Sequence, residues 1–390
     1  MLALLLLSLI PLALVGLRDL PWGFYLTATR PPSLTVVIPL VVVSGLAVVL
    51  LAFLRRRSSR WILLPALVLV GLFVVLKTEP LAAAASRWAR GLTGQNPLLA
   101  DPLDLTWLGF SYFAFRLLHT LRDSSSGRLP EMTAAEYITY VLFFPALPAG
   151  PIDRVERFLA DLRAHRGLDG SRALQAGVRL ARGVFKKFVL ADGLAIVALN
   201  PANAIEVQST LWLWVLVYGF ALRLYLDFSG YTDIAIGLGA LAGIDLPENF
   251  DRPYSRLNLA SFWNSWHITL AAWFRAYFFN PFTRALRQRR LPVWVIILLG
   301  QLGTMALIGL WHGVAWNFLL WGLWHAVGLF IHNRWLDWIR RHPHRLQLPA
   351  KAASVLSWAL TFHFVALGWV WFVLPQPDLA WNTLGRLVGG

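Results

Sequence analysis

The chain of 390 residues has no cysteine, and only 14% of its residues are charged. Without cysteine it has no disulfide scaffold, no thiolate metal site and no cysteine nucleophile. A soluble domain carries about 25% charged residues. The sequence also lacks a P-loop, a dinucleotide-binding fingerprint and the G-x-S-x-G elbow of serine hydrolases. These absences point away from soluble nucleotide-binding proteins and from covalent serine or cysteine catalysis.

Apolar residues make up 57% of the chain, in long runs. Several runs exceed the roughly 18 residues that a membrane-crossing helix needs, whereas barrel strands would alternate over segments of about ten residues. We therefore predict an all-α, polytopic membrane protein. No linker or repeat divides it, so we expect a single membrane domain over residues 1–390. The predicted segments are 1–17, 33–54, 61–77, 104–121, 136–150, 173–200, 211–243, 262–282, 291–311, 313–333 and 352–374.

Basic residues outnumber acidic ones by 35 to 20, which gives a net charge of +15. They cluster in short loops, as the positive-inside rule describes, so we expect lipid and no nucleic acid as the partner. Four arginine clusters all face the cytoplasm only if segment 136–150 does not cross the membrane fully. Pro145, Pro148 and Gly150 favour a re-entrant or interfacial segment there. We expect a multi-pass protein of the inner or plasma membrane with a cytoplasmic N-terminus, in which 1–17 is a spanning helix and not a cleaved signal.

Two histidines stand in apolar and aromatic runs, His312 within 309–317 and His267 within 258–270. An ionisable side chain at membrane depth is costly to place and usually lines a polar cavity or pathway. The alternative for each is a structural histidine that is hydrogen-bonded inside the core. His325 follows His312 by thirteen residues and cannot share its helical face, so we expect no metal site. We expect His325 and His363 to pack against neighbouring helices.

Six ordered stretches resemble the bacterial membrane-bound O-acyltransferases (MBOAT), closest to the branch of alginate O-acetyltransferases and teichoic-acid D-alanyl transferases. The resemblance is strongest over residues 105–374. It implies a bundle of about 10–11 membrane helices around a central tunnel, with His312 as the catalytic histidine and His267 as the second family histidine. Relatives often continue with a further C-terminal helix, so either that helix is absent or the chain is shorter than the full protein. The stretches are Phe143–Arg154, Phe185–Asp192, Tyr225–Asp233, Leu246–Tyr254, Phe262–Leu270 and Gly309–Asn317.

The resemblance implies transfer of a short acyl group, for which we expect acetyl, from a cytoplasmic thioester to a hydroxyl of a cell-envelope or exported polysaccharide. Such a reaction needs a base for the hydroxyl proton and a donor for the developing oxyanion. A neutral imidazole in an apolar tunnel suits the role of base, which we assign to His312. His267 would orient the donor or stabilise charge.

We expect acetyl-CoA as the acyl-donor substrate and no tightly bound cofactor. The alternative donor is a phosphopantetheine thioester on an acyl carrier protein, for D-alanyl transfer to teichoic acid. The acceptor is a glycan or an extracytoplasmic partner transferase. A non-catalytic acyl-export scaffold and a transporter remain as alternatives.

Several other side chains are candidates for binding the substrates. On continuous helices, Trp316 would share a face with His312, and Trp263 and Asn264 would share one with His267. Arg275 and the Lys186–Lys187 pair could attract phosphates of the donor, although cationic helix ends more commonly face lipid headgroups. We expect Asp227 to pair with Arg223. The candidate substrate-binding set is Trp263, Asn264, Trp311, Trp316, Asn317 and Arg275.

Overall fold

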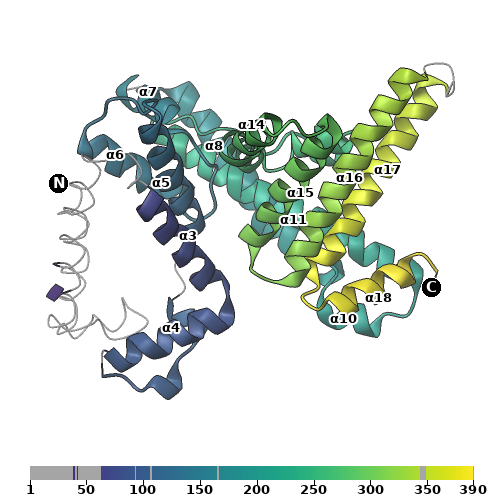
Figure 1. Cartoon of the computed structure of the whole chain (residues 1–390), viewed down its shortest axis with the longest axis horizontal. Coiled ribbons are helices and arrows are strands. Elements are labelled where there is room, and N and C mark those ends of the chain that lie inside the picture. Colours follow the sequence, from purple (N-terminus) through teal and green to yellow (C-terminus); the bar gives the residue numbers. More distant parts are fainter. Residues whose placement is uncertain are drawn as a thin grey trace. The chain divides into compact units, whose positions relative to one another are not determined.

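The computed structural model describes residues 38, 39, 42, 63–92, 94–105, 108–164, 167–342 and 348–389 (Figure 1). Over these residues the secondary structure is helical, and a single isolated bridge joins Phe250 and Trp266. The predicted all-α class is confirmed. The predicted segment 1–17 and most of segment 33–54 lie outside the described residues.

The chain divides into two compact units, the first formed by residues 1–147 and 154–159. The prediction of a single domain therefore stays a prediction. The described helices of the first unit are α3 (Leu63–Lys77), α4 (Glu79–Leu92), α5 (Phe110–Ser125), α6 (Ala134–Val141) and the start of α7 (Val155–Ala164). Helices α3 and α4 meet at 101°, as in a broken span or a re-entrant loop.

Helix α6 is held at its C-terminal end by a buried arginine. Arg116 is 2% exposed and donates hydrogen bonds to the carbonyl oxygens of Tyr140 and Val141, at 3.0 and 2.9 Å. The helix has only eight residues, or about 12 Å at 1.5 Å per residue, against a hydrocarbon core of about 30 Å. It is too short to cross the membrane as one helix, in agreement with a re-entrant or interfacial segment at 136–150.

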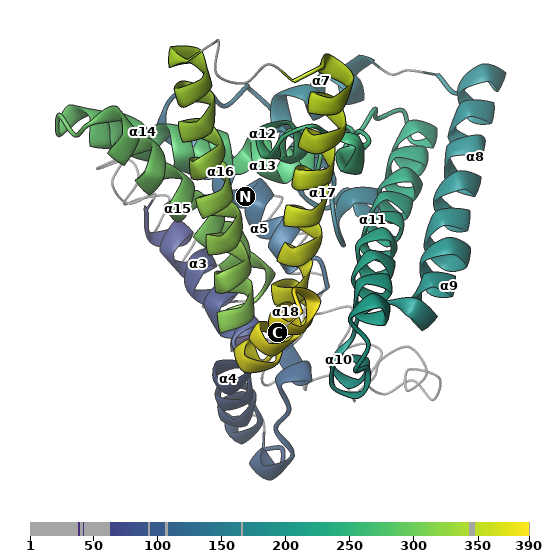
Figure 2. The same cartoon turned by 90° about the vertical axis from the view of Figure 1, so that its right-hand side faces the viewer.

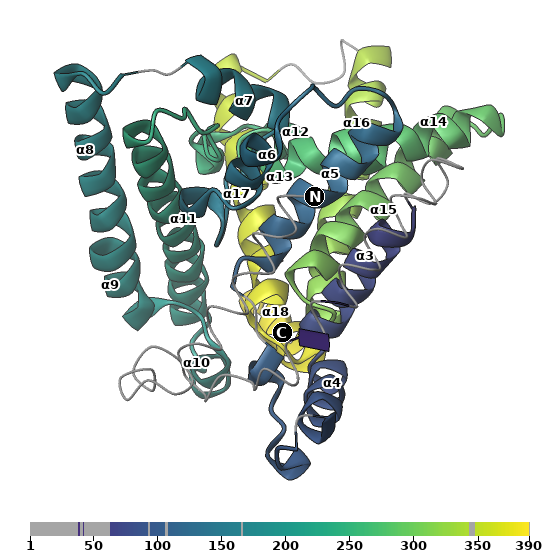
Figure 3. The same ribbon diagram turned by 90° about the vertical axis from the view of Figure 1, so that its left-hand side faces the viewer.

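The second unit comprises residues 148–153 and 160–390 and contains the long helices. Figures 2 and 3 both show α8 alongside α11. Helix α8 (Gly170–Val184) continues through the π-helical segment Phe185–Ala191 into α9 (Asp192–Leu194). The other long helices are α11 (Thr210–Leu241), α15 (Val293–His312), α16 (Trp316–Arg341) and α17 (Ala350–Val373). The shorter ones are α10 (Pro201–Glu206), α12 (Leu259–Trp263), α13 (Ile268–Phe274), α14 (Asn280–Gln288) and α18 (Pro377–Leu387).

Within the described ranges, four helical stretches are long and apolar enough to cross a membrane, or five if the bent α3–α4 pair counts as one span. They agree with the predicted segments 173–200, 211–243, 291–311 and 352–374. The chain is therefore a membrane protein with several spanning helices. The total of about 10–11 helices and the central tunnel stay predictions. The four stretches are Gly170–Glu206, Thr210–Leu241, Val293–His312 and Ala350–Val373.

One predicted segment is not a continuous helix. Over 262–282 the chain forms the end of α12, a loop, α13, a π-helical turn at Arg275–Phe279 and the start of α14. The break occurs because the backbone of His267 is left-handed, with φ of 44°, a conformation that interrupts a right-handed helix. The expectation of one continuous helical segment over 262–282 was wrong.

Glycines allow the helices of this unit to approach closely. A Cβ on Gly309 would lie 2.2 Å from the carbonyl oxygen of Phe318, and a Cβ on Gly322 would lie 2.3 Å from that of Met305. Helices α15 and α16 therefore touch backbone to backbone, as small residues permit between membrane helices. This contact places the end of α15, and with it His312, against the first turns of α16.

Candidate active site

His312 is the last residue of α15, and its ring lies among aromatic side chains from three helices. The chain then runs through Gly313, where a Cβ would lie 2.6 Å from the Phe318 ring, and enters α16 at Trp316. The His312 ring centroid lies 5.3 Å from that of Trp321 and 4.9 Å from that of Phe372, both edge to face. The half-buried imidazole is thus held by rings of α16 and α17.

His267 is 2% exposed and is anchored by Asn249, which follows α11. The Asn249 Oδ1 atom accepts hydrogen bonds from the backbone N–H of Thr269 at 3.2 Å and from its hydroxyl at 2.7 Å. It also lies 3.2 Å from Nδ1 of His267. The hydroxyl of Thr269 in turn accepts from the backbone N–H of Ile152 at 3.1 Å. Residues from three separate stretches therefore hold one imidazole in place.

This arrangement determines the tautomer of His267. The backbone N–H of Thr269 requires an acceptor, so the Asn249 atom that faces it is the amide oxygen and not the nitrogen. Nδ1 of His267 faces the same oxygen and must carry the hydrogen, which makes Nε2 the acceptor of the ring. Burial and, second, the nearby His312 hold the pKa of His267 well below its usual range. The ring is therefore a neutral imidazole.

The two histidines face a shared indole. The Trp311 ring lies 4.6 Å from that of His312 and 6.0 Å from that of His267, measured between centroids. His267 also contacts Phe228 of α11 at 4.8 Å between ring centroids, edge to face. His267, Trp311 and His312 therefore lie in one neighbourhood, and the roles expected for them stay predictions.

Three other candidates line a cavity of about 190 Å³ in the same unit. Trp263, Asn264 and Arg275 form part of its wall, together with apolar side chains of α15. Arg275 donates a hydrogen bond of 2.6 Å to Oδ1 of Asn264. Two buried polar atoms of the wall, Nε1 of Trp263 and Oε1 of Gln301, have no hydrogen-bond partner among the described residues. The cavity is mainly apolar with a few polar groups, as in many sites for small molecules.

The remaining two candidates differ from each other. Asn317 is 4% exposed, and its amide nitrogen lies 3.5 Å from the carbonyl oxygen of Phe372, which packs on His312. Trp316 is 71% exposed and begins a new helix. Its predicted place on the helical face of His312 was wrong because α15 ends at His312. The predicted shared face of Trp263, Asn264 and His267 was also wrong, because α12 ends at Trp263.

Sequence reasoning missed several residues that shape this region. Asn249 stood within a recognised stretch, but neither burial nor its contact with His267 can be read from the local pattern. Trp321 contacts both His312 and His325, at 5.3 and 5.2 Å between ring centroids. Phe228 and Phe372 belong to helices far away in the sequence. Only a three-dimensional arrangement shows that they touch the histidines.

The acidic residues of α11 also pair differently from the prediction. Asp227 accepts a hydrogen bond from Lys187 at 2.5 Å, so the predicted pairing with Arg223 was wrong. A cation from the packed neighbouring helix reaches Asp227 better than one on its own helix. The packing predictions for the other histidines are confirmed: His325 is fully buried among Trp263, Trp321 and Phe364, and His363 hydrogen-bonds Tyr218 at 2.8 Å.

Comparison with known proteins gives the family. Residues 60–369 match the model of MBOAT, the membrane-bound O-acyltransferase family. The match covers most of the chain, and it confirms the resemblance identified from the sequence, including the O-acyltransferase class that the family name describes.

The relatives include proteins named for both activities of the branch expected from the sequence. The chain is 31% identical to a teichoic acid D-alanyltransferase of Bacillus subtilis over 69% of this chain and 69% of that protein. It is 32% identical to a probable alginate O-acetylase of Azotobacter vinelandii over 72% of this chain and 53% of the relative. It is also 32% identical to a peptidoglycan O-acetyltransferase of Helicobacter pylori, over 65% of this chain and 46% of the relative. The chain thus spans about half the length of the latter two.

Proposed function

Because the chain belongs to the membrane-bound O-acyltransferase family, we propose that it moves a short acyl group from a thioester donor to a hydroxyl of an envelope or exported glycan. The observation that carries the proposal is the His267–Trp311–His312 arrangement. It places a neutral imidazole beside a second histidine at the junction of α11, α15 and the α12–α13 loop.

In this proposal His312 is the general base. A hydroxyl oxygen of the acceptor attacks the thioester carbonyl carbon, and its proton passes to an imidazole nitrogen of His312. The carbon–sulfur bond then breaks, and the leaving sulfur takes up a proton to become a thiol. The rings of Trp321, Phe372 and Trp311 pack around this imidazole, and a site that keeps water away from the thioester favours transfer to the acceptor over hydrolysis.

The role proposed for His267 follows from its hydrogen bonding. Its Nε2 is the acceptor of a ring that burial keeps uncharged, so it orients a hydroxyl or amide hydrogen of a substrate more readily than it donates to an oxyanion. Trp263, Asn264 and Arg275 would bind part of a substrate in the neighbouring cavity, where Arg275 and two unpartnered buried atoms supply polar contacts. No cofactor is required for this chemistry.

The donor and acceptor have two candidate identities. Relatives named as O-acetylases or O-acetyltransferases support acetyl transfer from acetyl-CoA to a polysaccharide, alone or through an extracytoplasmic partner transferase. The relative named as a teichoic acid D-alanyltransferase supports an aminoacyl group delivered by an acyl carrier protein. We favour acetyl and retain D-alanyl as the second candidate.

The proposed location is the inner or plasma membrane, with a cytoplasmic N-terminus and the donor entering from the cytoplasm. The clusters of basic residues in short loops support this orientation. The brevity of α6 supports it as well, because a helix of eight residues adds no full crossing.

The test compares the two donors on the full chain in membranes. Acyl incorporation into extracted envelope glycan is followed with labelled acetyl-CoA and, separately, with a D-alanyl carrier protein, against membranes that lack the chain. Incorporation from acetyl-CoA supports acetyl transfer, and incorporation only from the carrier protein selects D-alanyl transfer. If neither donor is consumed in the presence of acceptor and folded protein, the proposal fails, and a scaffold or transporter role takes its place.

A further inference from the structure

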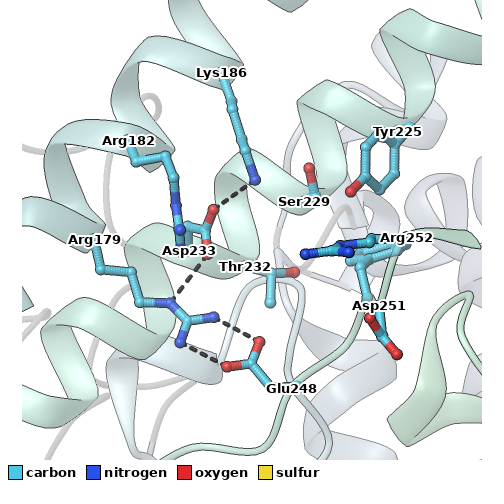
Figure 4. Close-up of a pocket in the computed structure, with 11 residues that line it drawn as sticks. Arg179, Arg182, Lys186, Tyr225, Ser229, Thr232, Asp233, Glu248, Asp251 and Arg252 are labelled. Carbon is cyan, nitrogen blue, oxygen red and sulfur yellow. Dashed lines mark hydrogen bonds and ion pairs between the residues drawn. The ribbon is translucent and has the colours of Figure 1, made fainter.

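A second, strongly polar cleft lies between α8 and α11, with a volume of about 240 Å³ (Figure 4). One wall carries Arg179 and Arg182 of α8 and Lys186 of the π-helical segment that follows it. Their spacing places all three on one helical face. Figure 4 shows Arg252, which lies in the loop after α11, across the cleft from these three side chains.

The three cations of the α8 wall share one buried carboxylate. Asp233 lies 3.0 Å from Arg179, 3.1 Å from Arg182 and 2.8 Å from Lys186, between nitrogen and oxygen atoms. Arg179 has a second partner in Glu248, which it binds through two hydrogen bonds of 2.6 Å. Arg182 and Lys186 have Asp233 alone, so one carboxylate balances more than one positive charge.

The cleft has an excess of positive charge. Four cations line it, and the carboxylate of Asp251 is taken by Arg256, which lies outside the lining. Only the carboxylates of Asp233 and Glu248 then remain to balance the four cations of the lining. The cleft therefore has a net excess of two positive charges. The guanidinium of Arg252 has no hydrogen bond or ion pair within the described part of the chain.

Two further observations indicate that the cleft takes a ligand. The hydroxyl of Ser229 lines it, is buried at 4% exposure and has no partner among the described residues. A buried hydroxyl without a partner is costly. Arg252 has a left-handed backbone with φ of 44°, and such strain in a residue other than glycine is concentrated at functional sites.

We propose that this cleft is a binding site for a phosphate group. Arginine binds phosphate oxygens through a planar fork, lysine adds a point charge, and a serine hydroxyl completes such a site. The phosphate would lie between Lys186 and Arg252 and would accept from Ser229. Its source is either a soluble phosphate ester, such as the proposed thioester donor, or the headgroup of an anionic phospholipid.

The cleft adjoins the candidate active site through an aromatic wall. Phe250 lines the cleft, and its ring lies 5.1 Å from that of Phe228, which in turn lies 4.8 Å from the ring of His267. A phosphate-bearing ligand held here would therefore be anchored close to the histidines. If the phosphate belongs to the acyl donor, this inference rests on the proposed function.

The test measures binding without turnover, on the purified full chain in a maltoside detergent free of phospholipid. The probes are coenzyme A, pantetheine (which has the thiol arm without phosphate) and phosphatidylglycerol in mixed micelles. Arg252→Gln is the informative variant because it breaks no hydrogen bond or ion pair among the described residues, and Arg289→Gln is the matched control at an exposed site. Loss of a charged partner is expected to weaken binding by roughly tenfold to a hundredfold.

The outcomes separate the sources. Binding of coenzyme A but not pantetheine, weakened in Arg252→Gln and unchanged in Arg289→Gln, identifies a soluble phosphate ester. Binding of phosphatidylglycerol but not of coenzyme A, again weakened in Arg252→Gln and unchanged in Arg289→Gln, identifies a lipid headgroup. Equal affinity of Arg252→Gln and the wild type for every probe, or no binding at all, overturns the proposal. Because His312→Gln should still bind the phosphate probe, failure of this site and failure of the proposed acyl transfer are distinguishable.

Discussion

Asn249 and His267 lie 3.2 Å apart, between Oδ1 and Nδ1, although 18 residues separate them in the chain. The amide of Asn249 is completely buried, and its oxygen also serves both the N–H and the hydroxyl of Thr269. One side chain therefore defines the tautomer of a buried histidine and joins the loop after α11 to the start of α13.

The first prediction concerns Asn249 itself. Asn249→Ala should reduce the free energy of unfolding by about 1–3 kcal/mol, because it leaves buried donors of Thr269 and His267 without an acceptor. Asn249→Asp should keep the acceptor and raise the pKa of His267, because a negative charge stabilises the imidazolium. The measurement is thermal unfolding together with the pH profile of acyl transfer. Identical profiles for Asn249→Asp and the wild type would contradict the assigned contact.

The second prediction concerns His312. His312→Gln keeps polarity and approximate size but cannot accept the proton at neutral pH, so acyl transfer should fall by roughly 10²–10⁴-fold while the protein remains folded. His342→Gln, at the exposed end of α16, is the control and should keep full activity. The measurement is acyl incorporation normalised to folded protein. Full activity of His312→Gln would remove the assignment of this residue as the base.

The third prediction concerns pH. The folded-state pKa of His267 lies below its unfolded value of about 6.5, so the unfolded chain binds more protons below that pH. Above about pH 6.5 the ring is neutral in both the folded and the unfolded chain, so its burial makes the free energy of unfolding no lower. As the pH is lowered from there toward the depressed folded pKa, the unfolded chain takes up a proton and the free energy of unfolding falls. His267→Gln should flatten this decline in melting temperature between pH 7.5 and pH 5. An equal decline in both proteins would show that His267 is not buried as a neutral ring.

The fourth prediction concerns the contact between α15 and α16. Gly309→Ala places a Cβ against the carbonyl oxygen of Phe318, so it should lower stability by about 1–3 kcal/mol and displace His312. Gly193→Ala in α9 is the control because nothing lies within 4 Å of the added Cβ. The measurement is thermal unfolding of both variants. A melting temperature for Gly309→Ala at or above that of the control would be inconsistent with the close approach.

The fifth prediction concerns topology. The native chain has no cysteine, so single cysteines can be introduced without other changes. If segment 136–150 does not cross the membrane, Ser125→Cys and Ala160→Cys should be labelled from the same face by an impermeant thiol reagent. Both side chains lie on the surface of the fold. Labelling from opposite faces would require a full crossing and would reverse the orientation of every later loop.

The sequence by itself determined the helical membrane class, the family and the position of most long helices. Hydrophobic runs such as 291–311 and 352–374 match α15 and α17 because a membrane-crossing helix satisfies its own backbone and needs only a sufficiently long apolar segment. The ordered stretches around His267 and His312 identified the family because they are local patterns.

Only the tertiary structure decided which groups meet. Local periodicity placed Trp316 beside His312 and paired Asp227 with Arg223, but α15 ends at His312 and Lys187 of the packed neighbour reaches Asp227 instead. The contact of Asn249 with His267 depends on a left-handed backbone at His267 and on a loop that follows a different helix. Such contacts are set by how helices pack and where a chain breaks. A pattern with a period of 3.6 residues describes one helix and contains no information about its neighbours.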